Sequence, residues 1–282
     1  MMHAMSSDAI PPVDPAPQQI VRYGAMRYLG VFTAPPSLVF DRQSQLILNT
    51  ERGTEVGQWL CVGTAPMIAA LPAPTRGEIL RVADARDSDR IAQMASLKPK
   101  YADKARELVH GQRLGMQIVD VEQLFGAERL LFYFIAENRV DFRDLVKSLA
   151  REFHVRIELR QINPREETRL IADYGDCGRP VCCNSFLVEM PQISMRMAKL
   201  QKSTLDPNKI TGRCGRLKCC LRYEQDVYEL HQAELPAVGK RIVTKVGQGR
   251  VLAQELLARQ VLVEFEDGRR QPVPIADVLS TL

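Results

Sequence analysis

A seven-residue cysteine motif occurs twice in this chain and constrains it more than any other feature. The first copy, residues 177–183, reads CGRPVCC, and the second copy, residues 214–220, reads CGRLKCC. Six of the seven cysteines lie in these two cysteine segments, and the remaining one is Cys61. Cysteines at such short spacing bind a metal or an iron–sulfur cluster, form disulfides, or carry out redox chemistry. The repetition indicates a task that both copies share.

The expected compartment argues against disulfides. The longest apolar run, residues 130–136, is far shorter than the roughly 20 residues that a membrane helix needs. The N-terminus lacks the basic start and apolar stretch of a secretory signal. We therefore expect a cytoplasmic protein without membrane insertion, in a reducing environment where structural disulfides are rare. Adjacent cysteines such as Cys182 and Cys183 also seldom bond to each other without strain.

Positive charge gathers around the cysteine segments. The whole chain has a net charge of +4, but residues 177–222 carry nine basic and two acidic side chains, a local net of +7. Such a region attracts an anionic cluster, RNA or an acidic partner, although a merely solvated surface is the plainer alternative. The candidate nucleic-acid or partner-binding residues are Arg179, Lys199, Lys202, Lys209, Arg213, Arg216, Lys218 and Arg222.

Apolar periodicity and turn residues predict an α+β fold in five parts. The β-rich lobe has short apolar strands, and the middle domain has a sandwich-like β-β-α-β order with a helix on a mostly antiparallel sheet. Hairpin turns near the C-terminus favour a small barrel. The predicted parts are a disordered arm (1–19), a β-rich N-terminal lobe (20–75), an α+β domain (76–170), a helical cysteine-rich cluster-binding region (171–234) and a small β-barrel-like domain (235–282).

Individual elements are predicted from the same patterns. Asp141 is expected to cap a helix. Strands are predicted at 20–23, 28–32, 45–49, 56–62, 116–125, 129–137, 155–162, 240–246, 250–257 and 260–266, and helices at 88–115, 141–153, 193–202 and 216–232.

A helix that begins near the second cysteine segment has chemical consequences. Free amides and the helix dipole stabilise thiolates in its first turns, and the neighbouring Arg216, Lys218 and Arg222 should act in the same direction. Consecutive helical residues point about 100° apart, so one copy cannot easily direct all its sulfurs at a single ion. The expected ligands are therefore drawn from both copies: Cys177, Cys182, Cys183, Cys214, Cys219 and Cys220.

The identity of the bound group stays open at this point. Cys177 with Cys182 or Cys183 would face Cys214 with Cys219 or Cys220 in a four-sulfur site, or each copy would supply three sulfurs and a partner the fourth. Tetrathiolate sites suit both zinc and iron–sulfur clusters. The C-x4-C-C spacing differs from the usual zinc-ribbon C-x2-C and favours the cluster. Bare redox thiols are a further alternative.

No enzyme motif accompanies the cysteines. The chain has no H-E-x-x-H, G-x-S-x-G or phosphate-loop sequence. Cys61 follows Trp59 and Leu60 in an apolar strand and is expected to be a core residue. The sequence therefore disfavours an enzyme and predicts no catalytic residue.

Several linked motifs resemble a known family. These are the TERGTEVG stretch at 50–57, RVDFRDLV at 139–146, RIELRQI at 156–162, and the two cysteine segments with MAK at 197–199 and NKITG at 208–212 between them. Together they resemble the polymerase-suppressor C-terminal domain family, in particular its bacterial YaaT/RicT-like members. The resemblance covers residues 21–224 and continues more loosely to the end.

The resemblance implies a non-enzymatic cytoplasmic regulatory protein. Members of this group form a complex with two small helical partners, the YlbF/YmcA-like proteins, and that complex carries iron–sulfur clusters. It acts with the endonuclease RNase Y in messenger RNA processing and, in spore-formers, influences the sporulation phosphorelay. The resemblance thus implies an iron–sulfur cofactor, expected to be of the 4Fe–4S type, on the six repeated cysteines.

Two other functions stay possible on the sequence. A direct RNA- or DNA-binding module with a structural zinc site would use the basic residues, although Phe186 and Tyr223 are the only aromatic residues there for base stacking. A dithiol oxidoreductase would need a reversible disulfide, and the usual C-x-x-C redox motif is missing.

Overall fold

The structure is a computed structural model that describes residues 17–171, 174–187 and 192–282. The described chain forms two compact units. The first unit holds residues 17–171 and 183–187, and the second holds 174–182 and 192–282. The predicted arm at 1–19 lies outside the described residues up to position 16, and the first strand begins at Gln19. No described helix is long and apolar enough to cross a membrane.

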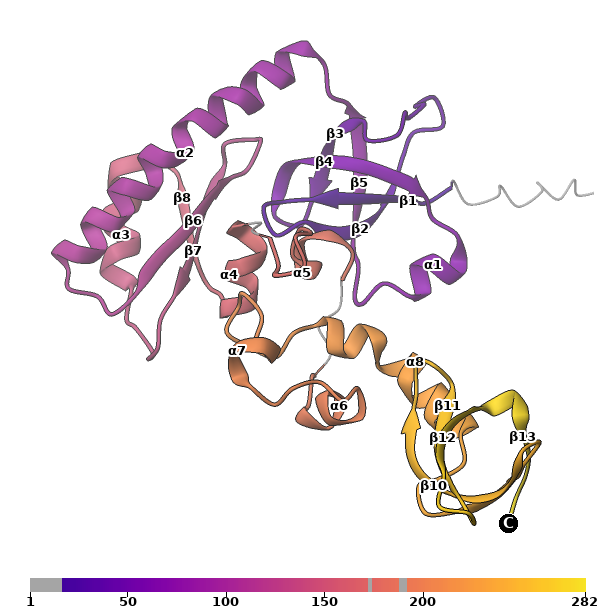
Figure 1. The fold of residues 1–282 in the computed structure, drawn as a ribbon. Coiled ribbons are helices and arrows are strands. Elements are labelled where there is room, and N and C mark those ends of the chain that lie inside the picture. Colours follow the sequence, from indigo (N-terminus) through magenta and orange to yellow (C-terminus); the bar gives the residue numbers. More distant parts are fainter. Residues whose placement is uncertain (1–16, 172–173, 188–191) are drawn as a thin grey trace, which may run out of the picture. The chain divides into compact units, whose positions relative to one another are not determined.

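The first unit opens with a closed five-stranded barrel of order β1-β2-β5-β3-β4 (Figure 1). Alternate side chains such as Val21, Phe32 and Leu48 fill its interior. Gly77 allows β5 to close the barrel, because a Cβ there would lie 2.3 Å from the Asn49 carbonyl oxygen. The elements are β1 (Gln19–Tyr23), β2 (Tyr28–Thr33), β3 (Gln45–Thr50), β4 (Gly53–Val62), α1 (Ala65–Ala69) and β5 (Thr75–Val82).

The predicted β-rich N-terminal lobe is confirmed. It is a closed barrel, and it extends beyond the predicted boundary at residue 75. β5 is not among the predicted strands, and it continues the barrel to Val82. Its sequence, TRGEILRV, alternates charged and apolar residues only weakly, and its parallel pairing with β2 depends on a long connection. Pairing of this kind is set by tertiary contacts rather than by a local turn.

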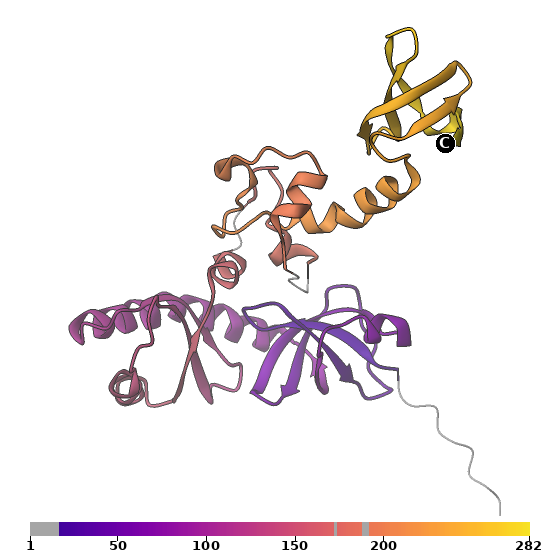
Figure 2. The ribbon, with the colours of Figure 1, turned by 90° about the horizontal axis from the view of Figure 1, so that it is seen from below.

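A three-stranded sheet of order β6-β7-β8 follows in the same unit. β6 pairs antiparallel with β7, and β7 pairs parallel with β8. Two helices pack on one face of this sheet, where Ala105, Leu145 and Phe132 share a core. Figure 2 shows the long α2 beside the strands. The elements are α2 (Ala85–Gly111), β6 (Gln117–Gln123), β7 (Arg129–Ile135), α3 (Arg143–Phe153), β8 (Arg156–Gln161) and α4 (Pro164–Ile171).

Local signals explain where these helices begin. Asp84 caps α2, because its side chain accepts from the Asp87 amide at 2.9 Å and Asp87 reciprocates at 2.9 Å. The predicted cap of α3 is displaced by one position: Phe142 occupies the cap, although Asp141 still accepts the Arg143 amide at 3.2 Å. α4 is not among the predicted helices.

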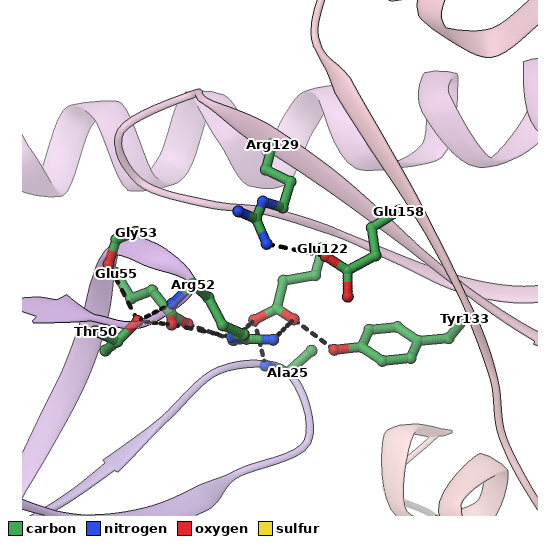
Figure 3. A network of polar contacts seen from close by, with 9 residues as sticks. All are labelled: Ala25, Thr50, Arg52, Gly53, Glu55, Glu122, Arg129, Tyr133 and Glu158. Carbon is green, nitrogen blue, oxygen red and sulfur yellow. Dashed lines mark hydrogen bonds and ion pairs between the residues drawn. The ribbon is translucent and has the colours of Figure 1, made fainter. Parts of the chain in front are cut away.

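A buried polar network joins the barrel to this sheet (Figure 3). Arg52, between β3 and β4, binds Glu55 of the barrel and donates to Glu122 of β6 at 3.2 Å. Glu122 also accepts the Tyr133 hydroxyl at 2.5 Å and the Ala25 amide at 2.8 Å. Burial alone would lower the pKa of Arg52, but the Glu55 hydrogen bond and the Glu122 charge raise it. One guanidinium is thus matched by two carboxylates, an arrangement that fixes the two parts of the first unit together.

The second unit contains the C-terminal sheet and both cysteine segments except Cys183, which belongs to the first unit. The predicted helices at 193–202 and 216–232 are confirmed in shorter form, and the cysteine-rich region is helical as expected. Its helices are α6 (Met195–Leu200), α7 (Pro207–Ile210) and α8 (Cys220–Glu234), while α5 (Cys182–Ser185) begins at the boundary of the two units. Figure 1 shows α8 leading into the C-terminal sheet, against which Tyr228 and Leu235 pack.

The predicted C-terminal barrel is wrong, because the C-terminal sheet is open. Its five strands have the order β12-β11-β10-β9-β13, with β12 and β13 at the edges. β12 contains Pro272 and Pro274, which lack the N–H group that closure of a ladder requires. The elements are β9 (Arg241–Thr244), β10 (Gly247–Glu255), β11 (Gln260–Phe265), β12 (Arg270–Pro274), the 3-10 turn η1 (Ile275–Asp277) and β13 (Val278–Thr281).

Candidate metal centre

The two cysteine segments begin with the same hairpin. Tyr174 bridges Pro180, and Thr211 bridges Leu217, each as an isolated antiparallel pair. In the first copy the Gly175 amide donates to the Arg179 carbonyl at 2.9 Å. In the second copy the amide of Gly212 donates to the carbonyl of Arg216 at 2.8 Å. The sequence repeat is therefore a structural repeat as well.

A glycine turns the chain directly after the first cysteine of each copy. Gly178 has a φ of 73° and Gly215 a φ of 70°, the left-handed region that glycine adopts at least cost. Their amides donate to the carbonyls of Gly175 and Gly212, both at 3.0 Å. The repeat thus extends two residues upstream of the predicted motif, to a glycine that stands two positions before the first cysteine. That signal is visible in the sequence, and the motif as predicted did not include it.

Two polar contacts hold the hairpins beside each other. Lys218 of the second copy forms an ion pair with Asp176 of the first at 2.6 Å. Arg213 donates from Nε to the Tyr174 carbonyl at 2.9 Å. Asp176 and Arg213 stand at equivalent positions, directly before the first cysteine of each copy, with opposite charges. All four residues belong to the second unit, so the two cysteine turns are neighbours within one compact body.

The six thiols form no disulfide with one another and differ in exposure. Cys177 and Cys220 are exposed, Cys182, Cys214 and Cys219 are half-buried, and Cys183 is 6% exposed. Within residues 17–171, 174–187 and 192–282, no three histidine, cysteine or acidic side chains are grouped closely enough to hold a metal ion. Adjacent hairpins therefore supply the expected donor atoms, while the ligand set predicted from both copies stays a prediction.

The predicted activation of the helix-start thiols is not confirmed for Cys220. The helix α8 begins at Cys220, four residues later than the predicted start at Arg216, and Cys219 occupies its N-cap. Although Cys220 is exposed overall, partial desolvation of its thiol and the neighbouring Cys219 thiolate raise its pKa, and the opposing effect of Lys218 is smaller. Two of the three cations expected to stabilise the thiolates form ion pairs with carboxylates. Lys218 pairs with Asp176, and Arg222 pairs with Asp226 at 2.7 Å. Desolvation therefore outweighs the helix start.

The basic residues predicted for nucleic-acid or partner binding fall into two groups. Besides Arg213, Lys218 and Arg222, Lys202 is also engaged, in an ion pair with Glu255 at 2.7 Å. The other four are exposed, and no ion pair is found for them within the described chain: Arg179, Lys199, Lys209 and Arg216. Cys61, expected in the core, is half-buried in β4.

Comparison with known proteins identifies the family. The chain is 40% identical over 231 residues to "Stage 0 sporulation protein YaaT" of Bacillus subtilis, covering 82% of this chain and 84% of that protein. The chain belongs to the PSP1 family. The PSP1 C-terminal conserved region matches residues 77–162, and the third domain of PSP1-like proteins matches 192–235. The polymerase-suppressor family expected from the linked motifs is thereby confirmed.

A more distant relative matches a smaller part of the chain. An uncharacterized protein of Schizosaccharomyces pombe is 30% identical to this PSP1-family chain over 79 residues, 28% of the chain and 10% of that protein. No solved structure matches the chain significantly. The conserved region of the family spans β5 to β8, and the third domain spans the second cysteine segment and α8.

Proposed function

We propose that this PSP1-family chain is a non-enzymatic adaptor that binds an iron–sulfur cluster and modulates RNase Y-dependent RNA processing within a protein complex. In spore-formers it would also influence the sporulation phosphorelay. The name of the Bacillus subtilis relative, a stage 0 sporulation protein, supports the link with sporulation. The observation that carries the proposal is the pair of matching cysteine hairpins, which are held beside each other by an ion pair of Lys218 and a hydrogen bond of Arg213.

The donor chemistry fits an iron–sulfur cluster. Thiolates are the ligands that such clusters use, and the proposed ligands are Cys177, Cys182, Cys183, Cys214, Cys219 and Cys220. Since no three of them converge in the described chain, binding would require the hairpins to rearrange or a partner to complete the ligand set. When bound, the cluster would supply a redox-active or iron-dependent link between the two hairpins. Zinc is the alternative occupant of the same thiols.

The chain's own residues would couple the cluster to partner binding. The second hairpin continues directly into α8, so an ordered Cys219 fixes the start of that helix. Tyr223, Val227 and Leu230 lie on α8 with 64%, 48% and 59% exposure, at helical spacing along one face. Order at the hairpins would therefore be transmitted to an exposed apolar face, where small helical YlbF/YmcA-like partners would dock.

A cellular experiment tests the proposal. In a bacterium that has RNase Y, the chromosomal copy is replaced by Cys214→Ser or by the control Cys61→Ser, and cleavage of RNase Y-dependent transcripts is mapped. We expect Cys214→Ser to resemble a deletion and Cys61→Ser to resemble the wild type, at equal protein abundance on immunoblots. Normal transcript cleavage in Cys214→Ser would contradict the proposal.

Direct nucleic-acid binding is a second candidate, favoured by the four exposed basic residues for which no ion pair is found in the described chain. Arg179 and Arg216 occupy equivalent positions of the two hairpins. If this candidate holds, the isolated chain binds RNA with an affinity that falls steeply with salt, and Arg179→Gln together with Arg216→Gln reduces the slope. Salt-independent or absent binding would exclude it.

A further inference from the structure

The tip of the β1–β2 hairpin is tightly positioned in the first unit. The Ala25 amide donates to Glu122 at 2.8 Å (Figure 3). Met26 is 1% exposed and packs in a core with Tyr133. Arg27 follows with a φ of 53°, a conformation that non-glycine residues rarely adopt. Its carbonyl accepts Nη2 of Arg169, on α4, at 3.0 Å. Backbone strain of this kind concentrates at functional sites.

Positive charge gathers at this tip of the first unit. Arg22, Arg27 and Arg169 lie close enough for Arg27 to lower the pKa of the other two, although burial is the larger cause in both. In the described residues neither Arg27 nor Arg169 forms an ion pair. Glu166 raises the pKa of Arg169, but this carboxylate also lies 3.9 Å from Arg160 in an ion pair. Burial and the charge of Arg27 together outweigh the neighbouring negative charges, so the pKa of Arg169 is lowered on balance.

Four buried side-chain atoms of the first unit have no hydrogen-bond partner among the described residues. These atoms are Nε of Arg27, Nε of Arg169, Oη of Tyr28 and Oδ1 of Asn184, all shielded from solvent. Tyr28 and Cys183 both act on the pKa of Arg169, and Asn184 follows Cys183 on α5. Buried polar groups are almost always paired, so a cluster of unpaired ones indicates a bound water or ion. Rotation of the Asn184 side-chain amide by about 180° exchanges its oxygen for its NH2 group, which can donate to an anion.

We propose that Arg27 and Arg169, with Tyr28 and Asn184, form a binding site for a small tetrahedral oxyanion, with inorganic phosphate as its physiological representative. Guanidinium groups donate parallel hydrogen bonds to such oxygens and neutralise their charge. A water molecule would satisfy the hydrogen bonds but would leave the positive charge unbalanced. All four residues belong to the first unit, and Asn184 directly follows Cys183, one of the proposed cluster ligands.

The full chain, titrated with sodium phosphate, tests this site by calorimetry and thermal unfolding. Sodium chloride at equal ionic strength serves as the salt control. We expect saturable stabilisation of the wild type, and affinity about tenfold or more lower in Arg27→Gln and Arg169→Gln. Arg76→Gln is the matched control, an exposed arginine on β5 of the same barrel, and it should bind as the wild type does.

Three results would overturn the proposal. Phosphate could fail to stabilise the wild type, or it could stabilise Arg27→Gln and Arg169→Gln equally, as a general salt effect would. Stabilisation by a 5′-phosphorylated RNA without any by inorganic phosphate would also contradict a small-anion site. If Arg169→Gln fails to fold, Arg169→Lys keeps the charge but loses the planar donor fork, and it should still weaken phosphate binding.

Discussion

The last thiol of the first cysteine segment, Cys183, is 6% exposed, whereas the equivalent Cys220 is exposed at the start of α8. Up to that point the two copies match in their bridges, their hydrogen bonds and the left-handed glycine. Cys183 also belongs to the first unit and Cys220 to the second. The two copies therefore share the structure of the hairpin, whereas the exposure of the third cysteine depends on the residues around it.

Removal of bound metal is expected to have the largest effect, and the effect should be the same in both copies. If the cluster holds the hairpins, its removal releases the Gly178 and Gly215 amides, and their hydrogen exchange should accelerate at least about tenfold. Strands β3 and β7 should be unaffected, because their cores contain no cysteine. Acceleration in one hairpin alone, measured by exchange and mass spectrometry, would show that the copies do not act together.

Serine substitution at the third cysteine should lower the free energy of unfolding more in the first copy than in the second. Cys183→Ser places a hydroxyl in a buried position and should lower the free energy of unfolding by about 1 kcal/mol. Cys220→Ser, at an exposed position, should change it by less than about 0.5 kcal/mol. Urea denaturation of the metal-free chain measures both values. Equal losses would mean that the difference in burial has no energetic consequence.

Alanine at the turn glycine should act alike in both hairpins. An added Cβ at Gly178 or Gly215 meets no atom within 4 Å, so the whole cost comes from the left-handed backbone, about 1 kcal/mol each. Gly111 also has open space around it but no left-handed φ, and Gly111→Ala is the control, with no loss expected. A large loss of stability from the substitution in only one hairpin would show that the two hairpins are not structurally equivalent.

The smallest effect concerns the ion pair between the hairpins. The hydrogen bond from Lys218 lowers the pKa of Asp176 below its ordinary value. The pair therefore stabilises the fold above the unfolded pKa of about 3.9, and this contribution is lost as the pH falls through the folded pKa. Asp176→Asn should flatten the stability profile below about pH 4. An unchanged profile would show that the pair forms no net stabilising contact.

Much of the fold follows from the sequence, for identifiable reasons. Apolar runs such as 130–135 predict β7, and the cluster of Leu145 and Leu149 predicts α3, because both signals are local. The closure of sheets is not local. The barrel closes through β5, whose pairing with β2 spans a long connection, and the C-terminal sheet stays open at the proline-containing β12.

The candidate site shows the same limit. The six repeated thiols and a helix after the second hairpin are predictable from the sequence, although α8 begins at Cys220 and not at the predicted Arg216. The burial of Cys183 and the Lys218–Asp176 pair arise from contacts between segments, which one sequence does not specify. The half-buried arginines Arg27 and Arg169 lie 142 positions apart and carry no shared motif.

The central claim is that the two hairpins jointly bind one iron–sulfur cluster. It is tested most directly by iron, sulfide and zinc analysis, with a visible spectrum, of the anaerobically purified chain and its Cys177→Ser and Cys214→Ser variants. The account predicts iron with matching sulfide in the wild type, and a loss of most of both in either variant, one from each copy. Zinc without sulfide, or retention of the cluster in either variant, would contradict it.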